Sequence, residues 1–277
     1  MKHGPITAEF LGGPANRILV LARHPVAFDG SCVLVCPPFA EEMNKSRRMV
    51  TELAHRLVAN SIAVVIPDLF GTGDSEGEFA QASWSRWVED LHAVESWIGK
   101  RGWRVTVLLG IRLGCILAAQ YSLQRGSAAR RAVFWQPAVD GARILDQFLR
   151  VRVAASLMRD DKESVGDLKQ RLARGEIVEV AGYGVSPQLA TELASLRLAD
   201  QCGGNLGEVR WFEVLRAADA SVPAGAAKTV ETLRQRGLDV RLQTVVGEPF
   251  WASTEIVCLP DLIRDSLSAV SGVAPHA

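Results

Sequence analysis

The apolar residues of this chain alternate between short runs and longer stretches with a helical spacing. The short runs have the length of buried strands and are bounded by glycine, proline or charged residues. They cover residues 31–36, 63–66, 105–109 and 131–135, after two shorter runs at 10–11 and 17–23. Helical patterns at 43–60 and 84–100 separate them. This alternation predicts an α/β fold with a mostly parallel central sheet and helices on both faces.

The pattern changes after residue 140. Residues 141–207 contain helical stretches, clearest at 145–157 and 187–198, and no convincing strand. Strand patterns return at 209–215 and 240–246, with a helix at 224–236 between them and a last helix at 256–270. We therefore expect one α/β core formed by residues 1–140 and 207–277. Residues 141–206 are expected to form a helical cap inserted over the carboxyl edge of the sheet.

Residues 110–114, Gly-Ile-Arg-Leu-Gly, join the apolar run at 105–109 to an apolar helix. Glycine has no Cβ, so two glycines four positions apart allow a tight turn in which the helix and a neighbouring strand approach closely. The nucleophile elbow G-x-S-x-G has this form, with the nucleophile at its tip. Arg112 occupies the tip here. An arginine stays protonated, so it cannot serve as an acyl-transfer nucleophile.

A second segment adds to the similarity with known hydrolases. The loop at 67–75, Pro-Asp-Leu-Phe-Gly-Thr-Gly-Asp-Ser, resembles the loop after the fourth strand in serine-aminopeptidase-like members of the α/β-hydrolase superfamily. With the elbow and the strand order, this resemblance covers nearly the whole chain and implies the α/β-hydrolase fold. More narrowly, the segments 37–48, 110–114 and 247–251 resemble the exosortase A system-associated hydrolase 2 family.

Proteins of that narrower family are generally encoded beside exosortase and exopolysaccharide genes of Gram-negative bacteria. The resemblance therefore implies a protein partner from such a locus. It implies no particular reaction, because the word hydrolase in the family name comes from the fold, and a fold does not fix a function.

A Ser-His-acid site on this fold has its members in the order nucleophile, acid, histidine. The acid position follows the penultimate strand, where Asp219 fits, and Phe250 stands where the histidine is expected. No histidine occurs between His92 and His276. Two of the three positions are therefore lost. Because loss of the nucleophile or the base costs about 10⁶ in kcat in subtilisin, ordinary serine hydrolysis is not expected.

Two other residues are candidate nucleophiles. Cys115 lies three residues after Arg112, in the first turn of the helix, where the helix dipole and the guanidinium would lower the pKa of its thiol. No histidine is placed to act as its base, and a buried structural cysteine is the commoner case. Ser75 lies in the 67–75 loop without a nucleophile motif of its own, so a turn residue is the simpler interpretation.

Arg112 can instead bind an anion. The helix after it offers free backbone N–H groups and the positive end of its dipole. The resemblance implies two oxyanion-hole donors, namely the N–H of Leu113 and the N–H of Phe39 or Ala40. The cation and these donors together would suit a carboxylate or a phosphate.

An internal salt bridge is the alternative interpretation of Arg112. Its candidate partners are Asp219, Glu41 and Glu42. The two interpretations can coexist, since a bridged arginine can still accept a ligand anion. Phe250 and Trp251 follow the last strand, so we expect them to line or close the cleft beside Asp219. An aromatic wall would keep the cleft dry and strengthen polar contacts inside it.

The composition limits the partners, cofactors and cellular location that we expect. Lys+Arg and Asp+Glu both number 31, so the net charge is zero and nothing global indicates nucleic acid or an acidic membrane as a partner. Five cysteines without a Cys-x-x-Cys pair argue against a disulfide framework or a zinc site, and we expect neither a metal nor another cofactor. The first residues lack the apolar stretch of a signal peptide, and no apolar run reaches the roughly 18 residues of a membrane span. These features predict a cytoplasmic protein.

Two classes of function remain. The chemistry of the elbow favours a pseudo-enzyme that binds an anionic or acylated ligand, or a protein partner, in the cleft. The alternative is a hydrolase or acyl-transfer enzyme that acts on esters or thioesters through a non-standard site. The family resemblance favours this alternative, but only by association.

Overall fold

A computed structural model describes residues 4–13, 15–125, 131–156 and 163–272 of the chain. An eight-stranded sheet forms its centre, in the order β1-β2-β4-β3-β5-β6-β9-β10. Its strands are β1 (Ile6–Leu11), β2 (Ile18–Arg23), β3 (Ser31–Cys36), β4 (Ala63–Pro67), β5 (Arg104–Ile111), β6 (Arg131–Trp135), β9 (Glu208–Leu215) and β10 (Asp239–Val246). β2 runs antiparallel to β1 and β4, and the remaining neighbours are parallel. The predicted mostly parallel sheet is confirmed.

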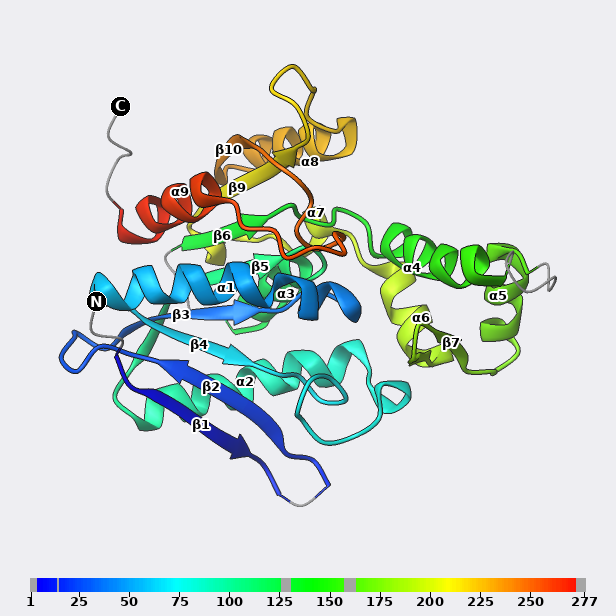
Figure 1. The fold of residues 1–277 in the computed structure, drawn as a ribbon, viewed down its shortest axis with the longest axis horizontal. Coiled ribbons are helices and arrows are strands. Elements are labelled where there is room, and N and C mark those ends of the chain that lie inside the picture. The colour runs from blue at the N-terminus through cyan, green and yellow to red at the C-terminus, as the bar shows by residue number, and fades with distance from the viewer. Residues whose placement is uncertain (1–3, 14, 126–130, 157–162, 273–277) are drawn as a thin grey trace.

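Helices cover both faces of the sheet, as predicted. One face carries α1 (Glu41–Ala59) and α9 (Pro260–Ser271), and the other carries α2 (Trp84–Lys100), α3 (Gly114–Arg125) and α8 (Ala224–Gln235). Figure 1 shows α1 and α9 in front of the sheet and α2 behind it. The strands in the middle of the sheet are apolar without alternation because both of their faces are buried. Within the described ranges, none of the helices combines the length and apolar character that a membrane crossing needs.

Much of the chain between β6 and β9 lies beyond the strand ends to which the arrows of β3 and β4 point in Figure 1, whereas its helical turns at residues 198–201 and 204–206 pack against α3. The whole segment comprises α4 (Gly141–Ser156), α5 (Val165–Ala173), α6 (Pro187–Ser195), α7 (Leu198–Gln201) and the short 3-10 helix η2 (Gly204–Leu206). This segment is called the insertion below. That it acts as a cap over a site stays a prediction.

The insertion also contains a hairpin that the sequence pattern did not predict. β7 (Val178–Val180) pairs antiparallel with β8 (Tyr183–Val185). Each strand has only three residues, which is too short for an alternating pattern to be recognised. Ala181 and Gly182 form the turn with φ angles of 50° and 87°, and positive values at both positions are typical of a type I′ turn.

The carboxyl ends of β3, β5 and β6 lie side by side, because these neighbours are parallel. Shortly after each strand comes one non-glycine residue with a positive φ angle: Ala40 at 50°, Arg112 at 55° and Gln136 at 45°. Such a backbone conformation costs on the order of 1–3 kcal/mol per residue and concentrates at catalytic and ligand-binding positions. This edge of the sheet therefore has the backbone features of a functional site.

Candidate functional site

The predicted strand-to-helix turn is present at residues 110–114. β5 ends one residue before Arg112, and α3 begins at Gly114. A Cβ atom on Gly110 would lie 2.6 Å from the Cα of Cys115, and one on Gly114 would lie 2.1 Å from the carbonyl oxygen of Cys36. Because both obstacles are backbone atoms, neither position accepts a side chain without a shift of the chain. The two-glycine frame of a nucleophile elbow is intact, with an arginine at its tip.

Hydrogen bonds to neighbouring strand ends hold the strained residues of this frame in place. The Arg112 N–H donates to the carbonyl oxygen of Trp135 at 2.9 Å, and the Gln136 N–H donates to that of Phe212 at 2.8 Å. The Gln136 side-chain oxygen in turn accepts a hydrogen bond from the Val214 N–H at 2.6 Å. The ends of β5, β6 and β9 are therefore tied together around the elbow.

The Arg112 side chain is only 12% exposed and has four contacts. Its Nε donates to Glu42 Oε1 at 3.1 Å, which is also an ion pair. Its Nη1 and Nη2 approach the carbonyl oxygen of Gln136 at 3.5 Å and Gln147 Oε1 at 3.4 Å. The guanidinium carbon lies 5.2 Å from the ring centre of Trp251. The structure thus contains the internal salt bridge considered above, with Glu42 as the partner, whereas the two Nη contacts are long for hydrogen bonds.

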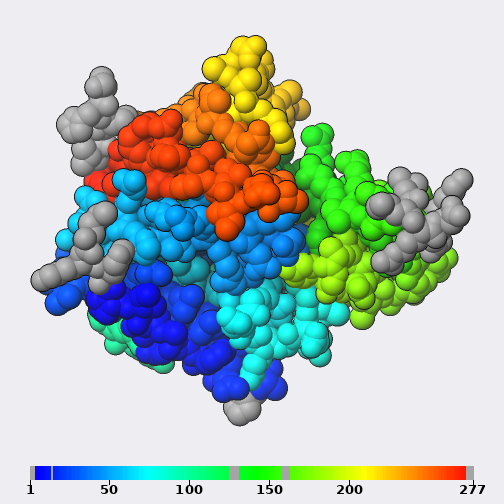
Figure 2. Space-filling model, in the orientation of Figure 1, coloured from blue at the N-terminus to red at the C-terminus, as the bar shows by residue number. Residues whose placement is uncertain are grey.

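A cavity of about 250 Å³, called the cleft below, opens beside this arginine. Its lining consists of Phe39, Glu41, Glu42, Lys45, Ile144, Gln147, Phe148, Val151, Ala181, Trp251 and Ala252. In Figure 2 the green insertion, the blue start of α1 and the orange segment after β10 meet at this place. Arg112 contacts three of the lining residues without lining the cleft itself. A mostly apolar wall with a few polar groups is the usual composition of a small-molecule site.

Two carboxyl groups flank Arg112 in a buried setting. Burial raises the pKa of Glu42, and the Arg112 guanidinium opposes that shift. Burial also raises the pKa of Glu213 in β9, against the Trp211 indole, which donates to its Oε1 at 2.7 Å, and against Arg112. The Oε2 atom of each glutamate is buried and, among the described atoms, has no hydrogen-bond partner. One guanidinium therefore compensates these two carboxyl groups incompletely.

Sequence reasoning did not find Glu213, Gln136 or Gln147. Glu213 interrupts the apolar run of β9, and an acidic residue in a buried strand was the available signal. Gln136 and Gln147 are uncharged residues outside any motif, so nothing in the sequence set them apart.

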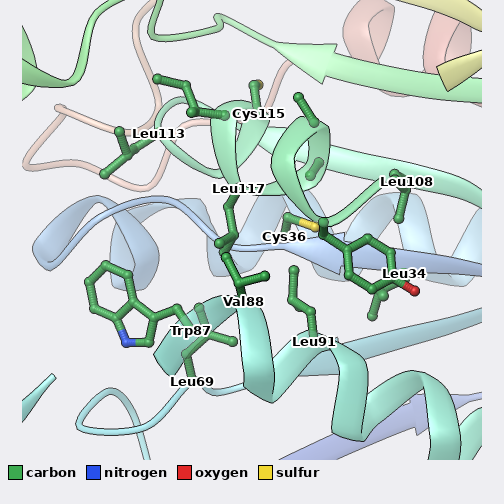
Figure 3. Close-up of a cluster of buried hydrophobic side chains, with 14 of the residues drawn as sticks. Leu34, Cys36, Leu69, Trp87, Val88, Leu91, Leu108, Leu113, Cys115 and Leu117 are labelled. Carbon is green, nitrogen blue, oxygen red and sulfur yellow. The ribbon is translucent and has the colours of Figure 1, made fainter. Parts of the chain in front are cut away.

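Cys115 is in a different environment from the one expected. It belongs to the cluster of buried side chains in Figure 3, in which Leu117 of the same helix points toward Val88 and Leu91 of α2. It is fully buried, and this burial raises the pKa of its thiol well above the ordinary value, while Arg112 opposes the shift only in part. The prediction of a lowered pKa is therefore wrong, because loss of water outweighs the nearby cation. The environment is that of a structural cysteine.

The two aromatic residues after β10 have different positions. Trp251 lines the cleft and faces Arg112, as expected. Phe250 does not line it, because its ring is buried on the α1 and α9 face of the sheet, with its centre 5.8 Å from that of Trp135. The expected ligand contact of Phe250 is thus corrected to a core contact. Its predicted role as the residue in the histidine position of the sequence is unaffected.

Asp219 is exposed in the loop between β9 and α8, which projects from the molecule at the top of Figure 1. In the part of the chain that the structure describes, it has no contact with Arg112. Ser75 has a structural setting: its hydroxyl donates to the Asp68 carbonyl oxygen at 2.5 Å and accepts from the Leu19 N–H at 2.8 Å. Within the described residues, the side chains of Asp219 and Ser75 thus have no hydrogen bond or ion pair with Arg112 at the elbow.

The predicted oxyanion donors lie around a much smaller cavity of about 20 Å³. Phe39, Ala40, Leu113 and Gly114 are among its lining residues. Within the described residues, the N–H groups of Ala40 and Leu113 donate to no protein acceptor. They are available for a ligand oxygen, and their use as donors stays a prediction. No group of three or more histidine, cysteine, aspartate or glutamate side chains in the described ranges is arranged to hold a metal ion.

The strand order, the elbow at the end of β5 and the helices on both faces define an α/β-hydrolase fold. The chain belongs to the serine aminopeptidase S33 family of hydrolases, whose family model matches residues 18–201. No curated protein matches the sequence.

Esterases are among the solved structures with this fold. Est1E from Butyrivibrio proteoclasticus, in a complex with ferulic acid, has a TM-score of 0.69 at 14% identity, over 96% of this chain and 97% of that one. A thermostable carboxyl esterase from Bacillus coagulans, in a complex with glycerol, has a TM-score of 0.64 at 11% identity, over 97% and 98%. A lipase/esterase from Lactobacillus plantarum has a TM-score of 0.58 at 15% identity, over 98% and 100%. At these identities the likeness concerns the fold.

Proposed function

We propose that this chain binds a small acylated or anionic ligand in the cleft and does not hydrolyse it by serine chemistry. The observation that supports this most is a preserved frame without its reactive groups. Ala40, Arg112 and Gln136 retain a strained backbone beside a cavity, although Arg112 replaces the nucleophile. A strained backbone lowers stability and is typical of functional sites. The side chains present here are compatible with a binding site.

The lining of the cleft suits a ligand with an apolar body. Phe39, Ile144, Phe148 and Trp251 present apolar surface, and the hairpin closes one side with Ala181. An acyl chain or an aromatic ring would displace water from these walls, at about 25 cal/mol per Å² of apolar surface buried.

The polar end of the ligand would contact Arg112. Its Nη2 contact with Gln147 is 3.4 Å long, so a carboxylate or phosphate oxygen could replace the Gln147 oxygen and make a shorter, charge-assisted bond. Arg112 and Lys45 offset part of the negative charge of Glu41 and Glu42 at this place, and burial lowers it further by raising the pKa of Glu42 and of Glu213. Glu42 would orient the arginine through its bond to Nε.

The second candidate function is an enzyme that hydrolyses or transfers acyl groups of esters or thioesters. Membership of a hydrolase family and the fold of known esterases favour it. It would require a nucleophile and a base other than the Ser-His pair. The exosortase or exopolysaccharide setting and a cytoplasmic location likewise remain proposals, which rest on the resemblance of segments such as 247–251 and on composition.

Ferulate and methyl ferulate test the binding proposal, because the methyl ester keeps the aromatic body and replaces the charged carboxylate by an uncharged ester. Calorimetry on the pure protein is expected to show binding of both, with ferulate tighter. Arg112→Lys keeps the charge but loses the planar fork, so it is expected to weaken ferulate binding, and Arg112→Ala to weaken it by roughly ten- to a hundredfold.

The matched control is Arg48→Ala, since Arg48 is an exposed arginine of α1 paired with Glu52. If neither probe binds, the cleft is not a site for this class of ligand. If ferulate binds the wild type and Arg112→Ala equally well, Arg112 is only a structural salt bridge.

A further inference from the structure

A second cavity, of about 120 Å³, lies between α1 and the strands β1, β2 and β4. It shares no lining residue with the cleft. Its apolar wall consists of Ile6, Leu21, Val35, Met43, Val50, Ile66 and Ile111. We call it the α1 cavity.

The α1 cavity exists because helical cover ends before the sheet does. α1 packs over β3 and β4 through residues such as Met49 and Leu53, but β1 and β2 extend beyond it, as Figure 1 shows. Ile6 in β1 is consequently 55% exposed at the rim. The apolar wall is thus reachable from solvent.

The charged residues that line the α1 cavity are two arginines and one aspartate. Arg47 and Asp68 both line it, and they form an ion pair at 3.3 Å. Asp68 also accepts a hydrogen bond from the Asp74 N–H at 3.0 Å. Arg23, at the end of β2, is partly buried, and its side chain has no ion pair or hydrogen bond to any described residue. Its guanidinium is therefore available to pair with an anion in this cavity.

We propose that the α1 cavity binds a short-chain carboxylate, with the alkyl chain between Leu21, Val50 and Ile66 and the carboxylate on Arg23. The guanidinium provides two parallel donors that match the two oxygens of a carboxylate. The apolar wall is open to solvent at its rim, so a short alkyl chain can lie along it. This site is independent of the proposed function of the cleft.

Hexanoate is the probe, because it combines a short alkyl chain with a head group that is charged at neutral pH. Isoleucine methyl NMR can locate the binding, since Ile6, Ile66 and Ile111 line the α1 cavity whereas Ile144 lines the cleft. Hexanoate is expected to shift the methyl signals of the first three. Hexanol, with the same chain and no charge, is expected to bind roughly tenfold more weakly. Acetate, with the charge and almost no chain, is also expected to bind more weakly.

Arg23→Gln is expected to reduce hexanoate affinity to that of hexanol, and Arg48→Gln on the outer side of α1 to leave it unchanged. Three results would overturn the proposal: no shift of the Ile6, Ile66 and Ile111 signals, equal affinities for hexanoate and hexanol, or full affinity in Arg23→Gln. Shifts confined to Ile144 would place the probe in the cleft, which would support the proposed function there and reject the α1 cavity as a carboxylate site.

Discussion

Arg112 occupies the tip of the elbow, where a serine hydrolase has its nucleophile. Its backbone has the φ angle of an elbow residue, and its side chain reaches Glu42 and Trp251. The sequence was sufficient to predict the elbow, because two glycines between an apolar strand and an apolar helix leave few alternatives. It did not select Glu42 over Glu41 or Asp219, because ion-pair partners depend on how α1 and the β9–α8 loop are placed in three dimensions.

The buried carboxyl group of Glu213 leads to a prediction about pH. Its pKa in the folded chain is raised, so the folded state holds the proton to a higher pH than the unfolded state does. Stability is therefore lost as pH rises from the usual carboxyl range through the raised value. Glu213→Gln stays neutral and keeps an acceptor for the Trp211 indole, so we expect it to gain on the order of 1 kcal/mol at pH 7.5 and nothing near pH 4.

Urea unfolding between pH 4 and pH 8 measures this difference. Glu248→Gln is the control, because Glu248 is exposed and paired with Arg216. A Glu213→Gln variant that is less stable than the wild type at pH 7.5 would mean that the ionised carboxylate is a required partner of Arg112.

At the scale of elements, the tight contact of α3 with the end of β3 depends on Gly114. A Cβ at this position would meet the carbonyl oxygen of Cys36 at 2.1 Å. We expect Gly114→Ala to cost about 3 kcal/mol, since backbone has to move. Gly99→Ala in α2 meets nothing within 4 Å and is expected to gain up to about 1 kcal/mol, because alanine favours helix. Thermal unfolding of the two variants measures the contrast, and equal effects would contradict the close approach at the elbow.

The elements themselves differed in how well their sequences predicted them. Strands such as β3 and β6 and the helix α2 have long apolar runs or a clear apolar face, and their predicted bounds are those of the structure. The last helix begins at Pro260 rather than at residue 256, because proline favours the first helical turn. The sequence pattern did not predict the β7–β8 hairpin. Its strands have three residues each, so they cannot be told apart from a loop by their apolar pattern.

At the scale of the molecule, the cleft and the α1 cavity are separate from one another and differ in their chemistry. The cleft lies between α1, the insertion and the segment after β10, and the α1 cavity lies at the uncovered end of the sheet. The spacing of apolar residues along the sequence predicted the sheet and its two helical layers, because each layer buries an apolar face. It could not predict the cavities, since a cavity depends on which side chains fail to fill the space between elements. The esterase relatives share the layers, and fold alone does not transfer their chemistry.

The most direct test of binding without serine hydrolysis is fluorophosphonate labelling of the pure protein, together with turnover of p-nitrophenyl butyrate. We expect neither labelling nor turnover above a heat-denatured control. Arg112→Ser should remain inactive as well, because Phe250 provides no base and Asp219 has no contact with the elbow. Wild-type labelling or turnover that disappears in Ser75→Ala or Cys115→Ala would contradict this account and establish the chain as an enzyme.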